Sequence, residues 1–134
     1  TELEDAAALC GAFPGTQLVL NHTGLPAERS AEGIAGWKRA LRSLAACPNA
    51  AIKISGLGVP GTRWTAESNR DIVLSAIEIF GVQRAMVAGN LPVDGLCAGF
   101  DEIYGGFRRI AAQFSAPEQR ALFHDNAVRI YAME

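Results

Sequence analysis

Three short apolar runs constrain the fold of this chain more than any other feature of its sequence. They read LVLNHTG, AIKISGLG and AMVAGNLPVDG, and each passes from strand-like residues into a polar residue followed by glycine or proline. They recur at nearly even intervals, with segments of helical periodicity between them. Strands that alternate with helices of this length form parallel βαβ units. The sequence therefore predicts an α/β fold with three parallel strands in sequential order, at Leu18–His22, Ala51–Ser55 and Ala85–Gly89.

The polar residues at the ends of these runs are the candidate functional residues. Parallel strands place all their carboxyl ends at one edge of the sheet, and this is the edge where ligands bind in α/β folds. We therefore expect His22, the loop that starts at Ser55, Asn90 and Asp94 to lie in one neighbourhood.

Apolar periodicity predicts the helices that accompany the strands. Three of them span Glu2–Ala12, Glu32–Cys47 and Ala66–Phe80, the last with Thr65 as its N-cap. A capping box opens a short helix at Ser115, and a last helical turn runs from about Asn126 to Tyr131. The clearest amphipathic helix follows the third run, with an apolar stripe of Leu96, Phe100, Ile103, Phe107, Ile110 and Phe114.

The length of 134 residues corresponds to one domain, residues 1–134, but three parallel strands cannot close a barrel. Strands that are apolar on both faces need cover on both faces. The chain also opens on Thr1, without Met, directly in helix-like sequence. We therefore expect it to be cut from a longer protein and to hold about half of a fold. Alone, it should be inactive, marginally stable and prone to associate into homo-oligomers.

Composition excludes several classes of partner. The formal net charge is −2 and there is no basic run, which argues against nucleic acid or an anionic membrane. The three cysteines are widely spaced and form no CxxC, so neither a disulfide scaffold nor a structural zinc site is expected. No apolar run is long enough to span a membrane and no signal peptide is visible. These features predict a cytoplasmic protein that acts on a small molecule.

Two strand residues can carry chemistry. His22 is predicted on the strand face of Leu18 and Leu20, where an imidazole can bind a metal or hydrogen-bond a substrate carbonyl. The alternative is a strand-end histidine that bonds only the backbone. Lys53 interrupts an otherwise apolar strand, so its ammonium must pair, extend to solvent or line a cavity.

The loop after the second run reads GLGVPG, which matches the dinucleotide-binding spacing GxGxxG. That motif requires a helix to start within the glycines, whereas Pro60, Trp64 and Thr65 delay the next helix. We interpret the segment as a long loop at the sheet edge. Arg63 and Trp64 could touch substrate there, or be an exposed arginine beside a packed tryptophan.

Polar residues beyond the third run have both chemical and structural interpretations. Asn90 is predicted on the face of Met86 and Ala88, at the strand end. Asp94 is either an acid/base group or the cap of the following helix. The triplet HDN that begins at His124 is interpreted as an Asx cap and is assigned to structure.

Four segments together resemble the amidohydrolase-2 family, in the branch of the fuconolactonases and 2-pyrone-4,6-dicarboxylate lactonases. They are LVLNHTGLP, GWKRALRSLAACPNAAIKISGLG, AGNLPVDG and FHDNAVRIYAME, and they cover essentially the whole chain in order. The family fold is a (β/α)8 TIM barrel within the metal-dependent hydrolase superfamily. The resemblance places this chain at strands six to eight, and the HxH pair of strand one has no counterpart here.

The resemblance also implies roles for individual residues. His22 matches the strand-six histidine, and Asn90 stands where most members carry the aspartate that activates water. An amide cannot act as a general base, so the base is Asp94, a group outside this chain, or absent. The branch includes lactonases that need no divalent metal. No metal ligand is therefore assigned in this chain, although the resemblance allows zinc in the full-length protein.

The combined expectation is a hydrolase that opens a lactone or related carbonyl compound with an activated water. His22 would hydrogen-bond the carbonyl, Asn90, Lys53 and Arg63 would position substrate, and Asp94 would transfer protons. Two alternatives remain open. One is a non-catalytic binding domain for a small molecule on the same architecture, and the other is a half-barrel completed by a second chain.

Overall fold

The three predicted strands form one parallel sheet. The computed structural model describes residues 2–133, and its strands are β1 (Leu18–Leu20), β2 (Ala50–Ile54) and β3 (Ala85–Val87), in the order β1-β2-β3. Both pairings are parallel, with Val19 opposite Ala51 and Lys53 opposite Met86. The predicted fold class and strand order are confirmed, although all three strands have slightly different limits from those expected.

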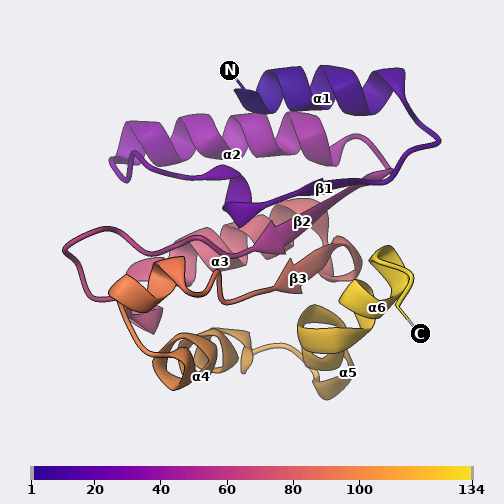
Figure 1. Cartoon of the computed structure of the whole chain (residues 1–134). Coiled ribbons are helices and arrows are strands. Elements are labelled where there is room, and N and C mark those ends of the chain that lie inside the picture. The colour runs from indigo at the N-terminus through magenta and orange to yellow at the C-terminus, as the bar shows by residue number, and fades with distance from the viewer. Residues whose placement is uncertain (1, 134) are drawn as a thin grey trace.

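The helices lie beside and behind the sheet in the view of Figure 1. The chain contains α1 (Glu2–Ala12), α2 (Ala31–Ala45), α3 (Ala66–Phe80), α4 (Phe100–Ala111), α5 (Ala116–Arg120) and α6 (Asn126–Ile130). Helices α1 and α2 lie together beyond β1, α3 lies behind β2, and α4 to α6 lie on the side of β3. Single turns, η1 (His22–Gly24), η2 (Val82–Arg84) and η3 (Val93–Leu96), adjoin the strands, and a π-helical turn, η4 (Ala121–Asp125), joins α5 to α6.

The two faces of the central strand differ. Ile52 and Ile54 are completely buried in the apolar core beneath the helices. Side chains alternate along a strand, so Lys53 lies on the opposite face, where it is half-buried. Among residues 2–133, the side chain of Lys53 makes neither a hydrogen bond nor an ion pair. One face of the sheet therefore builds the core, and the other presents an unpartnered cation.

Side-chain caps define the helix starts, as the sequence predicted for two of them. The hydroxyl of Thr65 accepts a hydrogen bond from the N–H of Ser68 at the start of α3, and Ser115 and Glu118 form the capping box of α5. Helix α2 begins one residue earlier than expected because Ser30 accepts from the N–H of Gly33.

The apolar stripe predicted through α4 is wrong at its beginning. Ile103, Phe107 and Ile110 are buried as expected, but Leu96 and Phe100 are exposed. Leu96 belongs to the turn η3, and α4 starts only after Gly99, whose N–H donates to the carboxylate of Glu102. The spacing of apolar residues continues from the turn η3 into α4, although the two are separate elements. Periodicity alone cannot reveal that interruption of the helix.

The Asx cap expected at the HDN triplet is also wrong. Asp125 has helical backbone angles and makes no capping bond, because its carboxylate accepts from His124 and Arg120. The structural role lies with Asn126 instead. Its buried side-chain amide donates to the carbonyls of Val82 and Ala85, each at 2.7 Å, and so attaches the C-terminal helix to the start of β3.

Helix α4 approaches the core so closely that one position accepts only glycine. A Cβ atom on Gly106 would overlap the six-membered ring of Trp64, a buried side chain that packs edge-on against Phe107. Gly105, the preceding residue of the same helix, has only the end of a flexible arginine near its Cβ position.

We predict that Gly106→Ala lowers the free energy of unfolding by about 1–3 kcal/mol, because the added methyl displaces Trp64. Gly105→Ala is the matched control and should be neutral or stabilise by about 0.5–1 kcal/mol through helix propensity. Urea unfolding of both variants measures the difference. Equal effects would contradict the close packing of α4 on Trp64.

Candidate functional site at the carboxyl ends of the strands

The segment Ser55–Gly58, directly after β2, joins the residues that follow the other two strands. On the β1 side, Nδ1 of His22 lies 3.1 Å from the hydroxyl of Ser55. On the β3 side, the N–H of Leu57 donates to the carboxylate of Asp94 at 3.1 Å. The predicted neighbourhood of His22, Asp94 and the loop after β2 therefore exists in the structure.

His22 reaches this position from a turn and not from the strand. The strand predicted as Leu18–His22 ends at Leu20, and His22 and Thr23 have positive φ values of 52° and 57°. The buried hydroxyl of Thr23 accepts from the N–H of Ser55 and donates to its carbonyl oxygen. This side chain replaces the backbone partner that a longer strand would offer. The placement of His22 on the face of Leu18 and Leu20 is therefore wrong, while its place at the edge holds.

Asn90 also lies in a turn. Strand β3 ends at Val87, and Asn90 has a φ of 50°, so it does not continue the face of Met86 and Ala88 as predicted. Its side-chain amide donates to Asp94 Oδ1 at 2.9 Å. Its backbone carbonyl oxygen accepts from the N–H of Asp94 at 3.0 Å. Asn90 and Asp94 thus form one closed turn at the end of β3.

Asp94 is buried, with 4 % of its surface exposed, and does not cap α4. Oδ2 accepts from Leu57 and Oδ1 accepts from the amide of Asn90. Gly58 passes so close that a Cβ there would lie 2.9 Å from Oδ1. A buried carboxylate needs such donors, and here one comes from its own turn and one from the loop after β2.

Arg29 is a further member of this network that the sequence did not reveal. Its guanidinium donates to the carbonyl of Leu57 at 3.0 Å and to the side chain of Asn69, a buried residue of α3, at 2.9 Å. Burial lowers the pKa of Arg29, which remains a cation because arginine titrates far above neutral pH. The backbone of Leu57 therefore donates its N–H to a carboxylate and accepts from a guanidinium at its carbonyl oxygen. Arg29 lies in a polar loop without periodicity, so no sequence pattern marks it.

A pocket of about 170 Å³ opens beside this network, between the loops after β1 and β2. Pro26, Arg29, Gly56, Gly58 and Val59 are among the residues that line it. It is small for a complete substrate site but large enough for part of a small molecule.

The two predicted substrate-binding cations lie apart from each other. Lys53 lies on the face of β2 opposite Ile52 and Ile54, two residues before Ser55. Arg63 is exposed and pairs with Glu102 at the start of α4, and this hydrogen bond lowers the pKa of the Glu102 carboxyl. Trp64 is buried against Phe107 and so belongs to the core. No contact of Arg63 joins it to His22 or Asp94.

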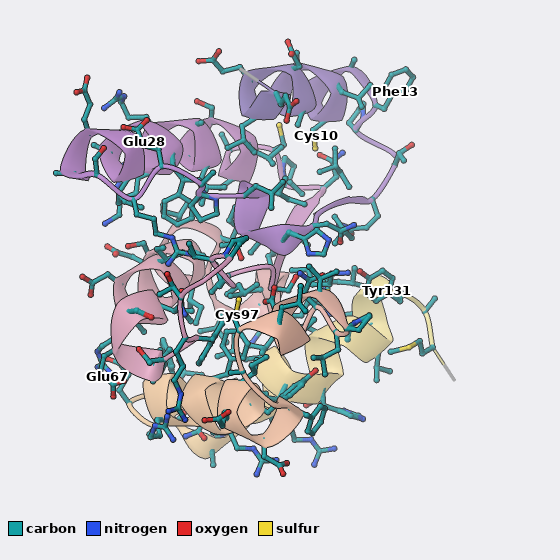
Figure 2. The ribbon with its side chains drawn as sticks, turned by 60° about the vertical axis from the view of Figure 1, so that its left-hand side comes forward. Cys10, Phe13, Glu28, Glu67, Cys97 and Tyr131 are labelled. Atoms are coloured by element: carbon teal, nitrogen blue, oxygen red, sulfur yellow. The ribbon has the colours of Figure 1, made fainter. Side chains whose placement is uncertain are left out.

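The residues of this edge do not by themselves fit a metal ion. Within residues 2–133, no three His, Cys, Asp or Glu side chains gather closely enough to hold one. His22 is bonded through Nδ1, and both oxygens of Asp94 already accept N–H groups. Figure 2 draws the side chains on the ribbon and labels Cys97, which directly follows η3.

The three parallel strands and their helices correspond to half of the TIM barrel of amidohydrolases. The model of the amidohydrolase family matches residues 1–133. The chain belongs to the amidohydrolase family.

Known relatives support the same assignment. The chain is 45 % identical over 130 residues to an uncharacterised protein of Sinorhizobium fredii, y4mH, covering 97 % of this chain and 43 % of that protein. It is 37 % identical to an L-fucono-1,5-lactonase of Burkholderia multivorans, covering 98 % of this chain and 48 % of the lactonase. The chain thus spans about half the length of these curated relatives.

Solved structures agree. An amidohydrolase from Burkholderia multivorans, crystallised with bound zinc, superposes with a TM-score of 0.87 at 33 % identity, covering 99 % of this chain and 50 % of that one. An amidohydrolase from Bifidobacterium longum gives 0.71 at 27 % identity, covering 99 % and 46 %. Among residues 2–133, no helix has the length and apolarity needed to cross a membrane.

Gly56 provides a test of the contact that positions His22. A Cβ on Gly56 would lie 2.7 Å from the Cβ of His22, and Gly56 has a φ of 65°. Gly61 has a similar φ of 76° but open space around it. Both alanine variants incur the cost of a positive φ, about 1 kcal/mol, while only Gly56→Ala also displaces His22.

We predict that Gly56→Ala lowers the free energy of unfolding by about 1–3 kcal/mol more than Gly61→Ala does, and shifts the NMR signals of the His22 ring. Urea unfolding and imidazole NMR spectra measure both effects. Unchanged His22 signals in Gly56→Ala would contradict the contact.

Proposed function

We propose that this chain supplies part of the active site of a hydrolase that opens sugar lactones. The observation that carries the proposal is the joining of His22, Asn90 and Asp94 around Ser55–Gly58, at the edge where TIM barrels hold their active sites. The similarity to the L-fucono-1,5-lactonase over 98 % of the chain supports the substrate class.

In this proposal, His22 hydrogen-bonds the carbonyl oxygen of the lactone. Donation from Nε2 requires Nδ1 to be the acceptor of its bond with the Ser55 hydroxyl, 3.1 Å away. Ser55 would then fix the tautomer as well as the orientation of the ring. The N–H of His22 would stabilise the oxyanion that forms when water attacks the carbonyl.

Lys53 and Asn90 would position the substrate. The side chain of Lys53 is half-buried and unpaired among the described residues, so its ammonium is available to a polar group of the substrate. The amide of Asn90 is oriented by Asp94 and leaves its side-chain carbonyl for a substrate hydroxyl. Arg63 contributes in this scheme only if it leaves Glu102.

Asp94 is the acid/base candidate that this chain offers. Each of its oxygens accepts one N–H group and keeps a second lone pair that can take a proton. Zinc in the complete protein would need ligands beyond residues 2–133, and no step proposed for this chain uses a metal.

The test uses the complete product of the gene and a panel of sugar lactones that includes L-fucono-1,5-lactone. We predict that His22→Ala and Asp94→Asn each lower kcat/KM by about 10²–10⁴-fold, the range typical of losing such groups. Asp71→Asn, an exposed substitution on α3, is the matched control and should have no effect. Wild-type turnover in Asp94→Asn would remove Asp94 from the mechanism. Saturable lactone binding without hydrolysis would favour the binding-domain alternative.

Asn90→Asp tests the amide in the site. The substitution would place a second carboxylate 2.9 Å from Asp94 Oδ1, so the upper apparent pKa of the pair rises above the value in the unfolded chain. The native state then binds more protons than the unfolded state. We therefore predict that the variant loses stability relative to wild type as the pH rises from about 4 to 8. Urea unfolding across this range measures it, and a pH-independent difference would contradict the Asn90–Asp94 hydrogen bond.

A further inference from the structure

Two of the three cysteines lie near each other at the amino ends of the strands, on the side of the sheet opposite the candidate site. Cys10 lies in the last turn of α1 and Cys47 lies in the turn between α2 and β2. The thiol of Cys47 is 3.7 Å from the carbonyl of Ala7, one helical turn before Cys10. Asn49, two residues after Cys47, donates its side-chain amide to the carbonyl of Cys10 at 3.2 Å. The segment around Cys47 therefore runs along the face of α1 that carries Cys10.

The backbone is held firmly at this place. The same amide group of Asn49 also donates to the carbonyls of Phe13 and Thr16, at 3.1 and 2.8 Å, so three carbonyls of the α1–β1 connection converge on one side chain. Cys10 is buried and Cys47 packs against the same apolar cluster. Burial, together with the neighbouring thiol of Cys47, raises the pKa of Cys10.

Cys47 is the more accessible thiol of the pair, and Cys10 borders a pocket. Cys10 lines an open, largely apolar pocket of about 290 Å³, together with Leu9, Phe13 and Leu18. Cys47 is half-buried and all three cysteines are free thiols. Cys97 lies at the other edge of the sheet, where its thiol is 3.4 Å from the carbonyl of Val59. It has no cysteine neighbour at that edge among the contacts of residues 2–133.

We propose that Cys10 and Cys47 are a redox modification site that closes to a reversible disulfide between α1 and the α2–β2 turn. The oxidant is a small disulfide such as oxidised glutathione. The thiolate of Cys47 attacks one sulfur of glutathione disulfide, forms a mixed disulfide and releases one glutathione thiolate. Cys10 loses its proton to solvent and attacks the Cys47 sulfur, forming the Cys10–Cys47 bond and releasing the second glutathione. Two protein thiols are oxidised and one glutathione disulfide is reduced.

The order of the two steps follows from the surroundings of the thiols. The raised pKa of Cys10 leaves little thiolate at neutral pH, so the first exchange falls on the more exposed Cys47. Cys10 then acts as the resolving thiol because it is held beside its partner. In a reducing compartment the bond would form only during oxidation and would open again afterwards.

The experiment exposes the native chain to glutathione redox buffers and maps the trypsin-cleaved products without reduction. Cleavage separates the cysteines into peptides 1–29, 43–53 and 85–108. We expect peptides 1–29 and 43–53 to be linked, in the wild type and equally in Cys97→Ala. In Cys10→Ala, glutathione should remain on Cys47, whereas in Cys47→Ala residue 10 should stay largely unmodified. Separate glutathione adducts, links through Cys97, or dimers in place of the internal link would overturn the proposal.

A second measurement distinguishes a native site from accidental pairing in the unfolded chain. The effective concentration of the two thiols should be at least about 10-fold higher in the native protein than in about 6 M guanidinium chloride. The crosslink should correspondingly raise Tm by on the order of 10 °C. An equal or lower effective concentration in the native protein, or a lowered Tm, would show that the fold does not hold the pair for bonding.

Discussion

The two backbone hydrogen bonds of Leu57 are the interactions on which this end of the molecule depends. Its N–H donates to a buried carboxylate from the β3 side, and its carbonyl accepts from a guanidinium that also reaches α3. A charged group at either end makes these bonds stronger than ordinary backbone hydrogen bonds. They hold three loops and one helix in a fixed relation, although the strands beneath are only three to five residues long. Short strands alone could not position side chains so closely.

The sequence predicted the architecture because that information is local and repetitive. Apolar runs, their even spacing and the caps at Thr65 and Ser115 each report on neighbouring residues. The strand ends were predicted less well, because side chains from elsewhere decide them. The hydroxyl of Thr23 takes the place of a ladder partner next to Ser55, and this ends β1 before His22. The periodicity of a sequence does not indicate such contacts between distant residues.

In the candidate site, too, the sequence predicted the general placement of residues but not their individual partners. Topology was sufficient to bring His22, Asn90 and Asp94 to one edge, since parallel strands share the direction of their ends. The particular partners were not predictable. Asp94 was expected at a helix cap or free for catalysis, yet it is buried between Leu57 and Asn90. Arg29 has no distinguishing sequence pattern, because a cation in a polar loop is recognised only when the fold places it 3.0 Å from a carbonyl oxygen.

The loop after β2 changes character abruptly along its length. Ser55 to Gly58 are held by groups from three directions, whereas residues 59–63 are all exposed. In such a loop the inner positions are fixed by their contacts, and the outer positions are free to vary. Substitutions in the outer half can alter the shape and charge around an entering ligand while His22 and Asp94 keep their places. Diversification of ligand preference on this scaffold would then concentrate in those five outer positions and leave the four inner ones unchanged.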